Sequence, residues 1–238
     1  MSDIIEALGN SLKSDLQSID QIAQNLANIN TPGYKSSTSI VKPFFNESIN
    51  SIRDLAEHSN QNVSKINFSS GALKQSKRSM DVAISGNAFM RVKVGSNIYY
   101  SRNGSLHISA SGLLVDAMGN SILSDSGEIQ LDQHMTVRFS KNGKIYQDDH
   151  FVAQLAMVKF NQIDQVTSRG NGLFETPLHN ISQAQNRLIH QGFIETSNVD
   201  TSYEMVRMME FSKHFESVQK ALSVYDQALG SGINKIGQ

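Results

Sequence analysis

The sequence predicts an α+β protein in which an antiparallel β-rich central domain is inserted between N- and C-terminal coiled-coil helices. Three observations lead to this fold class. Both ends of the 238-residue chain contain long stretches without Gly or Pro, which permits long helices. Both stretches carry apolar residues at alternating steps of three and four. The middle has Gly at intervals of seven to nine residues, the spacing of short strands joined by tight turns.

The N-terminal helix is expected to end before Pro32, because proline disfavours helical backbone at the preceding residue. Its apolar stripe is interrupted once, by Asp15. The stripe consists of Ile5, Leu8, Leu12, Ile19, Ile22, Leu26 and Ile29. Such a narrow seam is typical of a helix with a partner helix along its length, although an ordinary helix packed on its own domain would carry a similar stripe.

The C-terminal helix has a cleaner seam and is expected to end between Gly230 and Gly232. Its seam consists of Met208, Phe211, Phe215, Val218, Leu222, Tyr225 and Leu229. Two seams at opposite ends of one chain most simply pack on each other, which would bring the termini together. Met205, Met208 and Met209, near the start of this helix, fit core filling and an adaptable interface equally well.

The predicted domain organisation has four parts. Residues 1–35 form the N-terminal helix and the motif after it, and residues 36–70 form a connector rich in Ser and Asn. Residues 71–190 form the β-rich domain, and residues 191–238 contain the C-terminal helix, which pairs with the first. A short helix is expected in the connector at about residues 46–57.

Within the middle domain, apolar and polar residues alternate, which predicts about eight to ten strands with mostly local antiparallel pairing. Asn142-Gly143 is flanked by such alternation and predicts a hairpin with a type I′ turn, in which both central residues have positive φ. Residues 151–160 are more continuously apolar and predict a buried strand.

Composition and charge exclude several classes of function. The absence of Cys rules out disulfides, thiolate metal sites and Cys nucleophiles. A net charge of −1, from 21 basic and 22 acidic residues, gives no basis for nucleic-acid binding. Residues 1–30 lack the features of a signal peptide, and no run of about 20 apolar residues predicts insertion into a membrane.

No catalytic or metal-binding motif is found, so neither an enzymatic activity nor a cofactor is expected. The densest polar cluster, Asp148-Asp149-His150, is better explained as a solvated turn than as a ligand set. A group of basic residues is interpreted as a solvated face, because aromatic residues are not interleaved with it. This group consists of Lys74, Lys77, Arg78, Arg91, Lys93 and Arg102.

Residues 25–35 (NLANINTPGYK) and residues 80–86 (MDVAISG) are similar to the signatures NLANxxTPGYK and LDVAI.G of bacterial flagellar rod and hook proteins. Residues 100–104 (YSRNG) resemble YTRNG, and residues 192–200 (GFIETSNVD) resemble GYLEGSNVD, with Thr196 where Gly is common. The motif residues are Asn25, Leu26, Ala27, Asn28, Thr31, Pro32, Gly33, Tyr34, Asp81, Val82, Ala83, Ile84, Gly86, Ser197, Asn198 and Val199.

The resemblance implies a structural subunit of the flagellar rod. In this family the terminal helices form an axial coiled coil, pack with neighbouring subunits into a hollow tube, and carry the β-rich part outside. The expected partners are other rod subunits, copies of the same chain and the flagellar type III export apparatus, which uses no cleaved signal peptide. The expected location is the rod of the basal body, in the periplasmic space. The implied assembly interface is the N-terminal seam from Leu8 to Ile29 and the C-terminal seam from Met208 to Leu229.

Two other classes of function stay open from the sequence alone. One is a β-rich binding module carried on a helical stalk, and the other is a hydrolase with a dispersed active site. A stalk would form a stable coiled coil by itself, whereas helices that assemble with other subunits would be incompletely ordered in the free chain.

Overall fold

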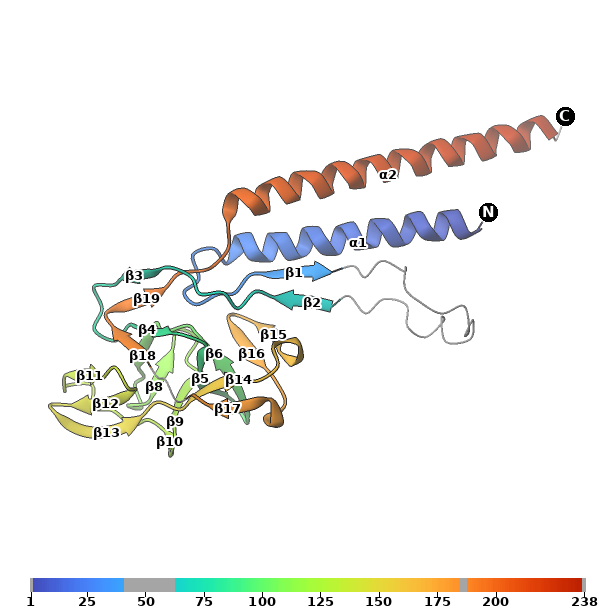
Figure 1. The fold of residues 1–238 in the computed structure, drawn as a ribbon. Coiled ribbons are helices and arrows are strands. Elements are labelled where there is room, and N and C mark those ends of the chain that lie inside the picture. Colours follow the sequence, from blue (N-terminus) through green and yellow to red (C-terminus); the bar gives the residue numbers. More distant parts are fainter. Residues whose placement is uncertain (1, 41–62, 185–187, 237–238) are drawn as a thin grey trace. The chain divides into compact units, whose positions relative to one another are not determined.

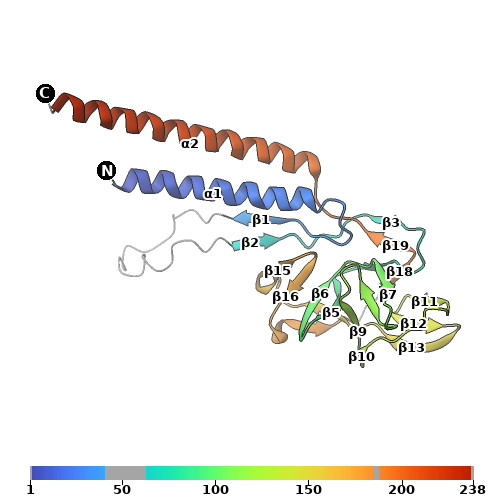
Figure 2. The same cartoon turned by 180° about the vertical axis from the view of Figure 1, so that it is seen from behind.

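The computed structural model describes residues 2–40, 63–184 and 188–236 (Figures 1 and 2). The chain divides into two compact units. The helical unit comprises Met1–Ala27, Ser37–Lys65 and Asp200–Gln238, and the β-rich unit comprises Asn28–Ser36 and Ile66–Val199. The helix expected at about residues 46–57 lies outside the described residues.

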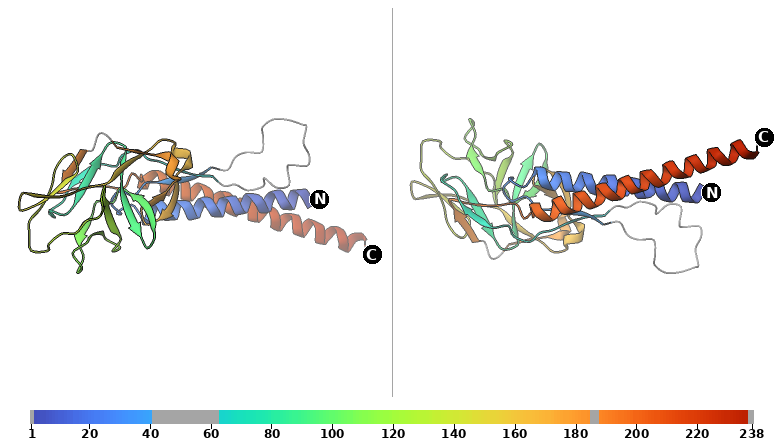
Figure 3. Two further views of the ribbon diagram at one scale, coloured as in Figure 1. Left: turned by 90° about the horizontal axis from the view of Figure 1, so that it is seen from below. Right: turned by 90° about the horizontal axis from the view of Figure 1, so that it is seen from above.

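The helical unit is built on two long helices, α1 (Ser2–Ala27) and α2 (Thr201–Ile236). They lie side by side and antiparallel, so both chain ends are at the same end of the pair (Figures 1 and 3). The fold class is therefore confirmed in its main features: two terminal helices flank a large antiparallel β-rich unit in the sequence. The same unit holds the pair of strands β1 (Ser37–Ile40) and β2 (Val63–Ile66).

The beginning of α2 follows from a local capping residue. The Asp200 side chain accepts a hydrogen bond from the Tyr203 backbone N–H at 3.1 Å, which satisfies one of the free N–H groups of the first turn. The predicted end between Gly230 and Gly232 is wrong, because α2 continues to Ile236. Glycine inside a helix costs only about 1 kcal/mol relative to alanine, and no proline follows to stop the helix.

The β-rich unit contains one large antiparallel sheet and three small ones. The large sheet has the order β15-β16-β6-β5-β9-β8-β7, with β10 on β9, β14 on β5 and β17 on β14. Its strands are β5 (Ala88–Val94), β6 (Asn97–Ser101), β7 (Leu106–Ile108), β8 (Leu114–Asp116), β9 (Ser121–Ser124), β10 (Gly127–Glu128), β14 (Met157–Phe160), β15 (Thr167–Gly170), β16 (Leu173–Glu175) and β17 (Ile181–Gln183).

The small sheets of the β-rich unit pair β11 with β12 and β13, β18 with β4, and β19 with β3. Their strands are β3 (Leu73–Gln75), β4 (Val82–Ser85), β11 (Val137–Phe139), β12 (Lys144–Gln147), β13 (His150–Gln154), β18 (Leu188–Gln191) and β19 (Phe193–Glu195). Two single-turn 3-10 helices, η1 (Ile163–Gln165) and η2 (Leu178–Asn180), complete the unit. The strands are more numerous and shorter than predicted, because tight turns divide the alternating runs into pieces of two to seven residues.

The hairpin at Asn142-Gly143 is confirmed, but its predicted turn type is wrong. Strands β11 and β12 pair from Val137 with Gln147 to Phe139 with Ile145, and only Gly143 of the two turn residues has positive φ. The following hairpin, between β12 and β13, has the two-residue loop Asp148-Asp149, and both residues have positive φ. This is the dihedral signature of a type I′ turn, so the densest polar cluster is a hairpin turn.

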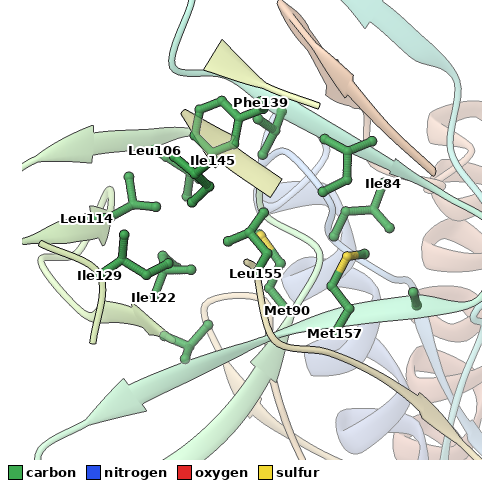
Figure 4. Close-up of a cluster of buried hydrophobic side chains, with 14 of the residues drawn as sticks. Ile84, Met90, Leu106, Leu114, Ile122, Ile129, Phe139, Ile145, Leu155 and Met157 are labelled. Carbon is green, nitrogen blue, oxygen red and sulfur yellow. The ribbon is translucent and has the colours of Figure 1, made fainter. Parts of the chain in front are cut away.

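The main core of the β-rich unit lies between the large sheet and the small sheets (Figure 4). Ile84 of β4 and Ile145 of β12 pack there with Met90 of β5 and Met157 of β14. A second cluster, around Phe89 and Phe174, is mainly aromatic. Residues 151–160 do not form one buried strand, because β13 ends at Gln154 and only β14 is largely buried.

Candidate assembly site

The predicted seam of α2 includes several of the least exposed side chains of that helix. Val218 is buried, and Met208, Phe211, Phe215, Leu222 and Tyr225 are partly buried. These residues recur at the predicted steps of three and four, and Leu229 lies where side chains are not described. Most of the seam therefore keeps some surface exposed in the single chain.

The α1 side of the helix pair differs from the predicted stripe. Its least exposed side chains include Asp15, Ser18, Ile22 and Asn25, three of which are polar. The predicted seam residues other than Ile22 are only partly buried, except Ile5, which is exposed. These partly buried residues are Leu8, Leu12, Ile19, Leu26 and Ile29.

Polar contacts explain why polar side chains occupy the buried line of α1. Asp15, which interrupts the apolar stripe, contacts Nδ1 of His214 at 2.7 Å. The Asn25 amide is fully buried and donates to Glu204 of α2 and to the Ser37 carbonyl, both at 2.8 Å. Its carbonyl oxygen accepts from the Ser37 N–H at 3.0 Å, so this motif residue joins α1, α2 and β1.

A second apolar surface, the α2 outer patch, consists of Tyr203, Met205, Val206 and Met209. Each of these side chains is about half exposed or more, and Met209 is 57% exposed. Met208, by contrast, is partly buried in the seam. Of the two interpretations of the methionines, core filling therefore suits Met208, and an adaptable interface suits Met205 and Met209.

In the β-rich unit, motif segments from distant parts of the chain meet at a buried ion cluster formed by Lys35, Arg102 and Glu195. The Lys35 ammonium lies 2.6 Å from Glu195 Oε1 and donates to the Ser69 carbonyl at 2.7 Å. Arg102 Nε lies 3.0 Å from Glu195 Oε2, although the geometry of this contact is not that of a hydrogen bond. We call these three residues the ion cluster; each is at most 2% exposed.

Backbone groups complete the surroundings of the ion cluster. Glu195 Oε1 also accepts from the Gly71 N–H at 2.9 Å. Arg102 Nη2 donates to the carbonyls of Ile84 at 2.8 Å and Gly86 at 2.6 Å, and its guanidinium lies 5.4 Å from the centre of the Phe89 ring. Burial lowers the pKa of Lys35 and that of Arg102 below their usual values, because a desolvated cation is disfavoured; Glu195 opposes both shifts.

Glycines of the motif segments let backbones approach closely around this cluster. Gly33 has φ of +69° and packs against the backbone of Arg102, where a Cβ would lie 2.5 Å from the carbonyl carbon. A Cβ on Gly71 would collide with the Thr196 carbonyl, and one on Gly104 with the Val82 carbonyl. A side chain at any of these positions would force the neighbouring backbone segments apart.

Other motif residues fasten the same segments. Asn198 accepts from the Ser36 N–H at 2.7 Å and donates to the carbonyls of Asn67 and Ser69 at 2.8 and 3.0 Å. Asp81 is buried, accepts from the hydroxyls of Ser76 and Ser105, and precedes the buried strand β4. The motifs therefore join the chain leaving α1 to the chain entering α2, within the β-rich unit.

Sequence reasoning missed the ion cluster. Arg102 was expected on a solvated face and is instead buried, because Glu195 and two carbonyls from distant parts of the chain surround it. Lys35 and Arg102 each occur in a segment that resembles the family, as does Glu195. The presence of one charged residue in each of these three segments is the sequence feature that could have indicated a buried contact.

The described residues give no positive indication of catalysis. Within residues 2–40, 63–184 and 188–236, no three His, Asp or Glu side chains lie close enough to hold a metal ion. Neither long helix, in the part of the chain that the structure describes, has the apolar length that a membrane-spanning helix requires. The exposed apolar surface of the helix pair makes that pair the candidate site of interaction with other chains.

Comparison with known proteins shows which families the chain is similar to. Residues 190–236 match the model of the flagellar basal body rod FlgEFG protein C-terminal, and residues 83–147 match that of the flagellar hook protein FlgE/F/G D1 domain. The chain is a homologue of these flagellar rod and hook proteins, which confirms the resemblance seen in the motifs.

Three relatives illustrate the similarity. The flagellar basal-body rod protein FlgF of Caulobacter vibrioides is 26% identical over 229 residues, which cover 92% of either chain. The flagellar hook-basal body complex protein FlhP of Bacillus subtilis is 27% identical, over 90% of this chain and 92% of the relative. The flagellar basal-body rod protein FlgG of Bacillus subtilis is 24% identical, over 94% of this chain and 95% of the relative. The similarity to these flagellar proteins therefore extends along nearly the whole length of this chain and of each relative.

Proposed function

We propose that this chain is a structural subunit of the flagellar basal-body rod, most similar in role to the proximal-rod protein FlgF, and that it is not an enzyme. The subunit polymerises through its terminal helices into the hollow drive shaft that serves motility. The observation that carries this proposal is the helix pair: its seam remains partly exposed, and the α2 outer patch adds apolar side chains that are about half exposed or more. Exposed apolar helix faces of this kind are interaction sites.

We assign one structural role to each of the four predicted parts of the chain. Residues 1–35 and 191–238 supply the axial coiled coil, residues 36–70 the connector, and residues 71–190 the β-rich outer domain. The interface consists of the two seams and joins this chain to copies of itself and to homologous rod subunits. Contacts that do not close on themselves generate a helical tube.

The proposal includes export by the flagellar type III apparatus without a cleaved signal peptide, and a position in the periplasmic part of the basal body. This route is proposed from the resemblance of the motif segments to flagellar rod and hook proteins. Neither nucleic acid nor a lipid bilayer is a proposed partner, and no cofactor is proposed.

The choice of FlgF over FlgG is supported by the sequence between the first helix and residue 71. FlgG proteins carry a GLQ.GTGV-like stretch there, and residues 40–70 contain nothing similar. The relatives named FlgF and FlgG have similar identities to this chain, so the distal-rod role of FlgG is the alternative. A non-flagellar binding module on a helical stalk is a weaker alternative.

The experiment that tests the proposal places a charge in the seam. Phe215→Asp or Leu222→Asp is expected to abolish incorporation into rods and motility, because burying an unpaired carboxylate in a helix interface is more unfavourable than the remaining helix packing is favourable. Gln219→Asp, at an exposed position of the same helix, is the matched control and should retain motility. Circular dichroism of the purified variants should show a folded β-rich unit. A motile strain carrying either seam variant would contradict the proposal.

A further inference from the structure

The β-rich unit contains a cavity of about 310 Å³ beside the ion cluster. Aromatic rings form much of its wall: Phe89 and Phe160 are stacked with centroids 4.4 Å apart, and Phe68 meets Phe89 edge-on at 5.5 Å. Ile163 of η1 lies at the cavity and is half exposed, and Arg102 contributes a charged wall. The volume is within the range of pockets that hold small ligands.

The charge beside this cavity is not balanced. The ion cluster holds two cations, Lys35 and Arg102, and one carboxylate, Glu195, all shielded from water. With all three ionised, a formal charge of +1 remains. Burying an uncompensated charge is costly, and an anion placed beside it removes part of that cost.

The guanidinium of Arg102 also retains hydrogen-bonding capacity. Its Nη2 donates to two carbonyls, and its Nε faces Glu195 Oε2 at 3.0 Å in the ion pair. Among the hydrogen bonds of the described residues, none uses Nη1 of this side chain. A buried arginine whose Nη1 is not used in these hydrogen bonds, on the wall of a cavity, is suited to a carboxylate, which matches its planar geometry.

We propose that this cavity binds a carboxylate carried on a small apolar stem. The carboxylate lies against Arg102 and neutralises the excess charge, while the stem packs on Phe68, Phe89 and Phe160. A monoanion suits the site because its charge of −1 balances the cluster, whereas a dianion would leave a negative charge in an aromatic cavity. The ligand is either a free organic acid or the acidic side chain of a neighbouring polypeptide. The inference does not rest on assembly of the rod.

The test uses the full-length purified chain and two soluble probes of matched shape. Benzoate and benzyl alcohol are titrated separately, and binding is followed by heteronuclear NMR of the Phe89 and Arg102 backbone amides. Benzoate is expected to bind at least about tenfold more tightly, since a hydrogen bond to a charged group contributes more than a neutral one. A blocked glutamyl peptide forms a second arm: tighter binding than benzoate identifies a polypeptide source, and weaker binding a free acid.

Two matched variants locate the binding. Ile163→Trp enlarges an exposed apolar side chain of η1 at the cavity and is expected to weaken benzoate binding at least tenfold. Leu178→Trp makes the same kind of change on η2, where the side chain is not part of the cavity wall, and should leave the affinity unchanged. The proposal is overturned if benzoate and the glutamyl peptide both fail to bind, if benzyl alcohol binds as tightly as benzoate, or if Ile163→Trp has no effect.

Discussion

Replacing Glu195 by Gln is the sharpest perturbation of the β-rich unit that the structure offers. The substitution keeps the size of the side chain and removes the carboxylate charge, which lies 2.6 Å from Lys35 Nζ and 3.0 Å from Arg102 Nε. Two buried cations then face each other without a counter-charge. We expect Glu195→Gln to lower the free energy of unfolding by about 3–5 kcal/mol, the usual cost of removing one partner from a buried ion pair.

Deprotonation of Lys35 limits this loss, because burial lowers the pKa of its ammonium and so reduces the cost of removing the proton. We therefore expect the loss of unfolding free energy to lie near the lower end of that range. For a chain of this size, about 3–5 kcal/mol corresponds to a fall in Tm of roughly 6–20 °C. The assay is urea denaturation followed by near-ultraviolet circular dichroism of the tyrosines, since the chain contains no Trp.

The matched control is Glu128→Gln. Glu128 pairs with Lys93 at 3.2 Å, but the two side chains are 39% and 42% exposed, so the pair contributes at most about 1 kcal/mol. The difference between the two Glu→Gln variants therefore measures burial of the ion pair and not the substitution itself. Equal stability of Glu195→Gln and Glu128→Gln would refute the claim that the ion cluster holds the motif segments together.

Three further outcomes are expected. Gly33→Ala should destabilise the chain by more than the roughly 1–2 kcal/mol that positive φ costs an L-residue, because the added Cβ meets the Arg102 backbone. Gly95→Ala is the control, since Gly95 has φ of +60° and open space around it. Equal losses of stability in urea denaturation would refute the packing argument. The folded pKa of Lys35 lies below its unfolded value of 10.5, so the unfolded chain binds more protons in the intervening window. Stability of the wild type relative to Lys35→Met should therefore rise with pH toward 10.5, and a flat difference would contradict the buried ammonium. Asn25→Ala should lower the stability of the helical unit by about 1–3 kcal/mol, since it removes the buried hydrogen bonds that this amide makes with the Ser37 backbone and with Glu204 Oε1. An unchanged loss of helicity with temperature would show that the contact does not hold the helices.

The main features of the fold follow from local patterns in the sequence. Apolar residues spaced three and four apart predicted the α2 seam, because this spacing places Met208, Phe215 and Leu222 on one helical face. Recurrent Gly gave the short strands, and several of these Gly residues do adopt positive φ. The extent of α2 was missed because Gly weakens a helix without ending it.

Contacts between distant residues could not be predicted in this way. The buried line of α1 contains Asp15 and Asn25, which become tolerable only through His214 and Glu204, nearly 200 residues away in the sequence. The type I′ turn lies at Asp148-Asp149 because the register of β12 and β13 leaves two loop residues there. The sequence Asn142-Gly143 has the composition that favours such a turn, but composition does not show the register of the strands. Arg102 was assigned to the surface because a single sequence does not show which carboxylate meets which cation.

The central claim is that exposed apolar surface on the terminal helices becomes buried in the rod. The absence of Cys allows a direct measurement, in which Met209→Cys in the α2 outer patch is labelled with a maleimide in the free chain and in isolated basal bodies. Met118→Cys, at a 65% exposed methionine of the β-rich unit, reports the accessibility of the outer domain. The account predicts rapid labelling of both variants in the free chain and strong protection of Met209→Cys, beyond that of Met118→Cys, in the basal body. Labelling of Met209→Cys at the same rate in both states would contradict it.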